Sequence, residues 1–342
     1  MPAAVLAAAF LLGTQTQMPA VVVVLDYTYD DNGFFNNTIA KAALEKAADD
    51  IEAAINPFAP GLGPISGGSV SGISGDTTVT FSNTYYVRDP EEISDEPDYE
   101  IPFNDPLAAD TVRIFVGSRA LSPGEFGKGS TAGIWPQPGA SGDPNQLAAA
   151  TAVAEANANL EFGRGGGPII SSSSGYVAGT PYTINFGSAV GSLALNSDPD
   201  LWHYDSTTNV APGKIDLYSI GLHEMLHVLG FGTSQSWDVK VSVSGNDWLG
   251  LSVIDLVGSG VNLVGGDFLD HITKGTMSTT VVGGYTQEAA MDPDTDPGQR
   301  KYLTQLDVAF LKDIGWNNVP EPSTGILVMI AGCAVFFRRR RD

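Results

Sequence analysis

Apolar and polar residues recur along the chain with spacings that predict a mixture of short strands and helices. Buried or half-buried strands are predicted where β-branched residues cluster or alternate with polar ones, at residues 21–26, 78–87, 111–116, 183–186 and 193–195. A helix is predicted over 38–55, with Ala42, Leu44 and Ile51 on or near one face, and a second over the alanine-rich residues 145–160. The pattern therefore predicts the α+β fold class.

Two stretches rich in Gly, Pro and Ser, residues 117–145 and 163–175, are interpreted as loops. Neither fits a phosphate-binding loop. The glycines at 163–167 are not placed between a strand and a helix, and Gly127-Lys128-Gly129-Ser130 lacks the Walker spacing. The acidic stretch 89–100 predicts a solvated loop, with a calcium-binding loop as the alternative.

The charge of the chain is strongly negative, with 39 Asp and Glu against 17 Lys and Arg and a net charge of −22. Four of those cations form one run, Arg338 to Arg341, so the rest of the chain is even more acidic. Such a surface repels phosphate backbones, which argues against a nucleic-acid partner and favours calcium or cationic partners. The single cysteine, Cys333, lies in the C-terminal apolar stretch, so the body of the protein has no disulfide and no thiol chemistry.

The first residues, 1–18, predict a secretory signal peptide, because an apolar run from Ala3 to Leu12 is followed by polar residues. No basic residue precedes this run, as expected for a truncated signal. A buried strand is the alternative interpretation.

The last residues, 318–342, predict a segment that engages a membrane. Pro320-Glu321-Pro322 is followed by an apolar stretch, Gly325 to Phe337, and then by the arginine run. As a helix the apolar stretch would span about 20 Å, short against a hydrocarbon core of about 30 Å. This order resembles the PEP-CTERM sorting signal of Gram-negative bacteria, which implies recognition and removal by an exosortase-type enzyme. An ordinary anchor or a buried terminal helix is the alternative.

The chemistry of the chain centres on residues 215–234, which predict a helix carrying His223, Glu224 and His227. Positions i and i+4 share one helix face, so both imidazoles can reach one metal ion. Glu224 stands beside the first of them, where it can accept a proton. This is the HExxH motif of zinc proteases.

A catalytic zinc site needs a third protein ligand, and only His203 and His271 remain as histidines. His203 is interpreted as a polar residue near a strand end. His271 fits the arrangement of the leishmanolysin-like metzincins, in which an insertion separates the glycine of the motif from the third histidine, and this resemblance makes His271 the predicted ligand. In the compact metzincin motif, which includes Gly230, the third histidine would stand where this chain has Thr233. The alternatives to His271 are carboxylates: Glu288, which has an ExxxD spacing with Asp292, and Asp255 or Asp270.

Two further features follow the motif. Met291, in Ala290-Met291-Asp292-Pro293, resembles the Met-turn that lies beneath the zinc site of metzincins. A capped helix is predicted after it, beginning at Thr304, with Asp307 in its first turn and Gly315 as its stop.

Together these features resemble the metzincin metallopeptidases, in the leishmanolysin-like arrangement with a remote third histidine, over about residues 183–342. The resemblance implies a metzincin-like zincin domain with a small mixed sheet, an active-site helix and a C-terminal helix, followed by an apolar sorting helix. It implies Zn²⁺ as cofactor, held by His223, His227 and His271, with Glu224 as general base and Met291 as support. The implied boundaries are 1–18 for the signal, 19–317 for the peptidase domain and 318–342 for the sorting segment.

The expected function is thus an exported zinc endopeptidase that acts on proteins or peptides at the envelope, the outer surface or outside a Gram-negative cell. Two alternatives from other classes remain: a non-catalytic surface or matrix protein with a structural zinc site, and a carbohydrate-binding or adhesin module. No motif supports the adhesin module. Calcium is a second candidate metal at Asp292, Asp294 and Asp296, although Pro297 occupies the glycine position of an EF-hand.

Overall fold

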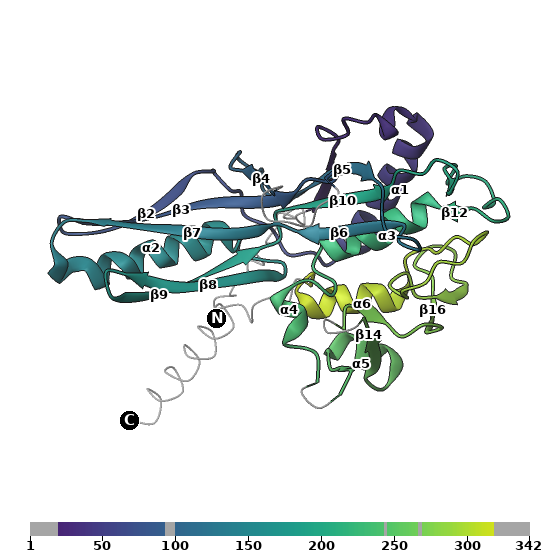
Figure 1. Cartoon of the computed structure of the whole chain (residues 1–342). Helices are drawn as coiled ribbons and strands as arrows, with labels where there is room; N and C mark the ends of the chain where they lie inside the picture. The colour runs from purple at the N-terminus through teal and green to yellow at the C-terminus, as the bar shows by residue number, and fades with distance from the viewer. Residues whose placement is uncertain (1–19, 93–99, 243–244, 266–268, 318–342) are drawn as a thin grey trace, which may run out of the picture.

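The structure is a computed structural model that describes residues 20–92, 100–242, 245–265 and 269–317 (Figure 1). The chain has a mixed α+β fold with several small sheets. Its helices are α1 (Thr38–Ile55), α2 (Leu147–Phe162), α3 (Leu217–Val228), α4 (Gln235–Asp238), α5 (Leu251–Val257) and α6 (Gln305–Ile314), with 3₁₀ turns η1 (Phe34–Asn36) and η3 (Pro144–Gln146). None of the described helices is long and apolar enough to cross a membrane. The predicted signal and sorting segments lie outside the described residues.

The central sheet is small and mixed. It has the order β1-β5-β10-β6, with β1 (Val22–Asp26), β5 (Thr111–Arg119), β10 (Val190–Asn196) and β6 (Gly127–Thr131). The first three strands are parallel, and β6 runs antiparallel to β10. Strand β6 is therefore an edge of this sheet.

Helices α1 and α3 pack together beside this sheet, and α6 adds its apolar side to the same core. Leu44, Ile51 and Ile55 of α1 are fully buried there. Ala42, expected on or near the apolar face of α1, is exposed, and Ala43 is buried in its place. The reason is helical periodicity: Ala43 lies one turn before Ala47 on the buried face.

A second group of elements forms an elongated unit, the α2 lobe, at the left of Figure 1. It contains α2 and the strands β2 (Ser69–Ser74), β3 (Thr77–Arg88), β4 (Glu100–Phe103), β7 (Gly133–Ser141), β8 (Ile169–Val177) and β9 (Thr180–Gly187). Helix α2 contacts β2, β3 and β9, and Phe81, Phe162 and Phe186 fill the core between them. The helix approaches β2 closely at Gly72, where a Cβ would lie 2.7 Å from the Cα of Ala154.

The prediction of loops at 117–145 and 163–175 is wrong. The first range contains β6 and β7 and the second contains most of β8. Glycine, serine and proline weaken a strand by local propensity. Here pairing with β10, β3 and β9 supplies the backbone hydrogen bonds that define the strands.

Arg164 joins the α2 lobe to the central sheet from a fully buried position. Its guanidinium donates hydrogen bonds to the carbonyl oxygens of Gly63, Ala108, Thr111 and Ser188 at 2.6–2.9 Å. Burial lowers the pKa of this arginine to about 10. Four carbonyl acceptors thus replace the water that the charged group loses on burial.

The remaining strands are short and lie in the C-terminal half. They are β11 (Trp202–His203), β12 (Ile215–Asp216), β13 (Asp247–Trp248), β14 (Val261–Val264), β15 (His271–Ile272), β16 (Met277–Thr279) and β17 (Thr286–Glu288). Strand β15 pairs with β14, so that His271 stands opposite Val264.

Candidate metal centre

Helix α3 begins at a strongly anchored cap. The Asp216 carboxylate accepts hydrogen bonds from the backbone N–H and the hydroxyl of Ser219, and Arg300 contacts both of its oxygens at 2.7 and 3.0 Å. Every residue of the helix is buried. Because its start is fixed, α3 presents His223 and His227, one turn apart, at a defined position.

The structure brings His271 of β15 to these two histidines. The Nε2 atoms of the three rings lie 3.0 Å (His223 to His271), 3.2 Å (His223 to His227) and 3.3 Å (His227 to His271) apart. Three ligand atoms this close can bind one metal ion. Among the described residues, no other group of three or more His, Cys, Asp or Glu is gathered in this way.

The other nitrogen of each ring shows which tautomer is present. Nδ1 of His223 lies 2.8 Å from the carbonyl oxygen of Ala290, and Nδ1 of His227 lies 2.8 Å from that of Phe231. Nδ1 of His271 lies 2.7 Å from an Asp270 carboxylate oxygen. All three partners are acceptors, so each Nδ1 carries the proton and each Nε2 presents a lone pair.

Three lone pairs that converge without a donor between them repel one another, and a cation removes that repulsion. Zinc binds imidazole nitrogen at about 2.0–2.1 Å, so two nitrogens in a tetrahedral site lie about 3.3 Å apart. The observed separations of 3.0–3.3 Å are close to this value. The residues present therefore fit a zinc ion as a group of three neutral nitrogen ligands.

The electrostatics also favour neutral imidazoles at His223 and His227. Burial lowers the pKa of His223 well below its usual range, and the neighbouring rings of His227 and His271 lower it further. Burial likewise lowers the pKa of His227 to about 4. Rings that resist protonation keep their Nε2 lone pairs for a metal ion at neutral pH.

Glu224 lies beside the triad in a buried position, with 8% of its surface exposed. Its Oε2 accepts a hydrogen bond of 2.6 Å from the backbone N–H of Gly129 on β6. Burial raises the pKa of this carboxyl to about 7, and the Gly129 hydrogen bond opposes the rise. A carboxylate with such a pKa can accept and release a proton near neutral pH.

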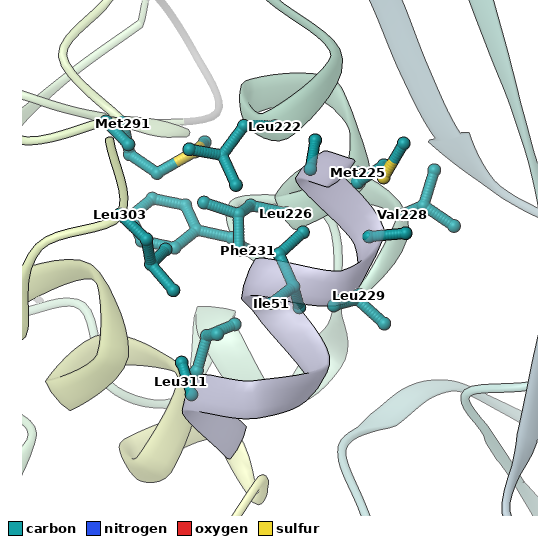
Figure 2. Packing of buried hydrophobic residues seen from close by; sticks show 14 of the residues in the cluster. Ile51, Leu222, Met225, Leu226, Val228, Leu229, Phe231, Met291, Leu303 and Leu311 are labelled. Atoms are coloured by element: carbon teal, nitrogen blue, oxygen red, sulfur yellow. The ribbon is translucent and has the colours of Figure 1, made fainter. Parts of the chain in front are cut away.

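Met291 is fully buried. Figure 2 shows its side chain in one cluster with Leu222 and Leu226 of α3 and with Phe231 and Leu303. The backbone on either side of this methionine takes part in the site, because the Ala290 carbonyl oxygen holds Nδ1 of His223.

Helix α6 supports this turn through its first residues. Thr304 is the N-cap, as the sequence predicted, and it forms a capping box with Asp307. The Asp307 carboxylate, which is fully buried, also accepts hydrogen bonds from the backbone N–H groups of Ala290 and Met291 at 3.0 and 3.1 Å. One side chain therefore caps α6 and holds the turn that orients His223.

The alternative ligands lie elsewhere. Both ring nitrogens of His203 contact atoms of its own loop, at Asp205, Thr208 and Ala211. The carboxylates of Glu288 and Asp292 form ion pairs of 3.1 and 3.2 Å with the buried Lys301.

Three other positions that the sequence raised as possible ligand positions also lie outside the group of converging nitrogens. Asp270 contacts the far side of the His271 ring, and Asp255 is an exposed residue of α5. Thr233, at the third position of the compact motif, donates a hydrogen bond to the carbonyl oxygen of His227. None of these three belongs to the group of converging nitrogens.

A pocket of about 450 Å³ opens onto His223 and His271 of the triad and onto Glu224. It lies between the chain entering β6, at Gly124 to Gly127, and the segment after Met291, at Pro293 to Asp296. Four carboxylates line it, Glu125, Glu224, Asp294 and Asp296, and Asp294 forms an ion pair with Lys274. The pocket is therefore polar and acidic.

Sequence reasoning missed the groups that hold the three histidines and Glu224 in place. These are the carbonyls of Ala290 and Phe231, the carboxylates of Asp270 and Asp307, and the amide of Gly129. Backbone groups leave no signal in residue identity. The capping position of Asp307 was visible, but its second set of hydrogen bonds depends on a turn 16 residues earlier.

Comparison with protein-family models, with curated proteins and with solved structures found no match to this chain.

Proposed function

We propose that the protein is a zinc-dependent endopeptidase of the metzincin type, in which Glu224 is the general base. One observation carries the proposal: three imidazoles converge on one point beside a buried carboxylate, at the base of an open pocket. His223, His227 and His271 would hold the ion.

The arrangement favours catalysis over a structural role. Structural zinc sites are closed by four protein ligands, often cysteines, whereas catalytic sites keep a position open. The group of ligand atoms found among the described residues contains three nitrogens and no fourth donor. The pocket also leads from the surface to His223 and His271.

When bound, zinc would lower the pKa of a water molecule and polarise the carbonyl group of the substrate. The side chains of the protein would carry the proton. Glu224, with its pKa near 7, accepts a proton from the attacking water and delivers it to the leaving nitrogen. The Asp270 carboxylate and the Ala290 and Phe231 carbonyls keep the three rings in one orientation throughout.

A peptide substrate is supported by the edge strand β6. Within the part of the chain that the structure describes, the strand pairs only with β10, and the residues that lead into it line the pocket. An unpaired strand edge binds an extended peptide through backbone hydrogen bonds. On β6 the N–H of Gly129 is already bonded to Glu224, so a peptide would use the other backbone groups of this edge. An extended chain beside β6 would pass the histidine triad.

Export is part of this proposal. It is supported by the signal pattern of residues 1–18 and by the sorting pattern of 318–342, which together imply a place in the cell envelope or beyond and an exosortase-type partner.

The test compares the full chain with three variants for bound zinc and for casein hydrolysis. We expect Glu224→Gln to keep zinc and to lose hydrolysis by about 10²–10⁴-fold. We expect His271→Ala to lose both, and His203→Ala, the matched control, to keep both. A parent protein that holds zinc and cleaves no peptide would support the structural-zinc surface protein instead.

A further inference from the structure

Strand β6 contacts helix α3 at Glu224 through two glycines. Gly127 and Gly129 alternate on the strand and pair with Leu195 and Leu193 of β10. The amide of Gly129 donates its hydrogen bond to Glu224 Oε2 at 2.6 Å. A hydrogen bond to a carboxylate from a backbone amide is strong and directional, so it selects one side-chain conformation of Glu224.

Space explains why both positions are glycine. A Cβ at position 127 would lie 2.6 Å from Cγ of Glu224, 2.9 Å from its Oε1 and 2.7 Å from Cγ2 of Ile220. A Cβ at position 129 would overlap the carbonyl oxygen of Glu224 and lie 3.1 Å from its Cα. Neither glycine has a left-handed backbone conformation, so the requirement is one of volume.

The two glycines therefore meet different parts of the same residue. Position 127 faces the side chain of Glu224, and position 129 faces its backbone while holding its carboxylate. Simple close packing of a helix on a strand would need small residues against the helix backbone only. Gly127 instead leaves room for the side chain of Glu224, which close packing against the helix backbone does not require.

We infer that Gly127 and Gly129 are positioning residues for Glu224. The Gly129 amide fixes one carboxylate oxygen, and the absence of a side chain at Gly127 leaves the volume in which the carboxylate arm lies. The consequence for catalysis rests on the proposed function. The placement of the side chain does not, and it can be tested separately.

The first test is kinetic and uses the zinc-loaded full chain. In Gly127→Ala the methyl group displaces the carboxylate arm of Glu224, and a displacement of about 1 Å lowers kcat by about 10²-fold. Bound zinc stays near the parent value, and kcat falls by a larger factor than KM changes. Gly139→Ala on β7 is the control, because its Cβ would have no neighbour nearer than 4.0 Å. Parent-like kcat in Gly127→Ala would overturn the inference.

The second test needs no activity. Melting temperatures are measured for Gly127→Ala and Gly129→Ala, each in the parent and in the Glu224→Ala background. Overpacking lowers Tm by roughly 3–9 °C. The fall in Tm caused by Gly127→Ala should be smaller when the Glu224 side chain is removed, because the Cγ and Oε1 atoms that the new methyl group would meet are gone. The steric loss from Gly129→Ala should persist, because its closest contact is with the backbone.

The two tests separate the two proposals. If Gly127→Ala lowers Tm equally in the parent and in the Glu224→Ala background, Gly127 does not position the Glu224 side chain. If the fall in Tm from Gly127→Ala depends on Glu224 but the parent protein cleaves no peptide, the positioning role stands and the peptidase proposal is rejected.

Discussion

The α2 lobe and the metal-centre half of the molecule are held together in different ways. In the α2 lobe, large apolar side chains such as Phe81, Phe162 and Phe186 share one core, and the strands hold one another through regular backbone ladders. The other half has a larger apolar core, shared by α1, α3 and α6, and adds to it single polar groups that act in sequence: Asp307 holds the turn at Ala290, and Ala290 holds His223.

The two halves should therefore respond differently to substitution. A change in the shared core should lower stability without a specific effect on the metal. A change in the chain of polar contacts should alter the metal centre more than its burial alone suggests. Three substitutions test the contrast, ordered by their expected effect on zinc affinity.

Asp270→Ala should have the largest effect on zinc affinity. The Asp270 carboxylate accepts the Nδ1 proton of His271, and loss of such a partner weakens metal binding by about 10–100-fold. Asp270 is partly exposed, so the fold should be little affected. Zinc affinity is measured by competition with a chelator. Asp255→Ala on α5 is the control, and equal affinities for the two variants would contradict the role of Asp270.

Asp307→Ala should weaken zinc binding by about tenfold, because His223 loses its support only indirectly. The same change leaves the buried N–H groups of Ala290, Met291 and Thr304 without an acceptor. Stability should therefore fall by about 4 kcal/mol, or roughly 10 °C in Tm. Calorimetry and chelator competition measure the two effects, with the exposed Asp247→Ala as control. A fall in Tm with unchanged zinc affinity would show that Asp307 and α6 do not support the metal centre.

Phe186→Ala should leave zinc affinity unchanged while it lowers stability. Phe186 is fully buried in the α2 lobe, where its ring stacks on that of Phe162 at 6.0 Å. Removal of a buried phenylalanine costs about 3–5 kcal/mol. Tyr176→Ala, at a position that is 71% exposed, is the control for thermal unfolding. A matching loss of zinc would show that the two halves are coupled.

The same contrast explains how much could be predicted from the sequence. Helices α1 and α6 lie within a residue or two of their predicted bounds, because caps and apolar periodicity are local signals. Strands β6, β7 and β8 were missed, because their Gly, Ser and Pro residues favour loops and only distant partners make them strands.

The metal centre follows the same rule. His223 and His227 stand on one face of α3 through local spacing. Elimination among the four histidines left His203 and His271, and the resemblance to leishmanolysin-like metzincins selected His271. Its approach depends on the pairing of β15 with β14 and could not be derived from spacing. That the three rings bind zinc stays a proposal.

Arg164 bears on the order in which the protein assembles. Its four carbonyl partners lie 24 to 101 residues away along the chain. Contacts of such long range form only after the α2 lobe and the central sheet have met, so they are expected to be absent from the folding transition state. Arg164→Ala should then speed unfolding and leave the refolding rate nearly unchanged, which stopped-flow mixing can measure. The buried guanidinium would thus slow unfolding and prolong the lifetime of the folded protein.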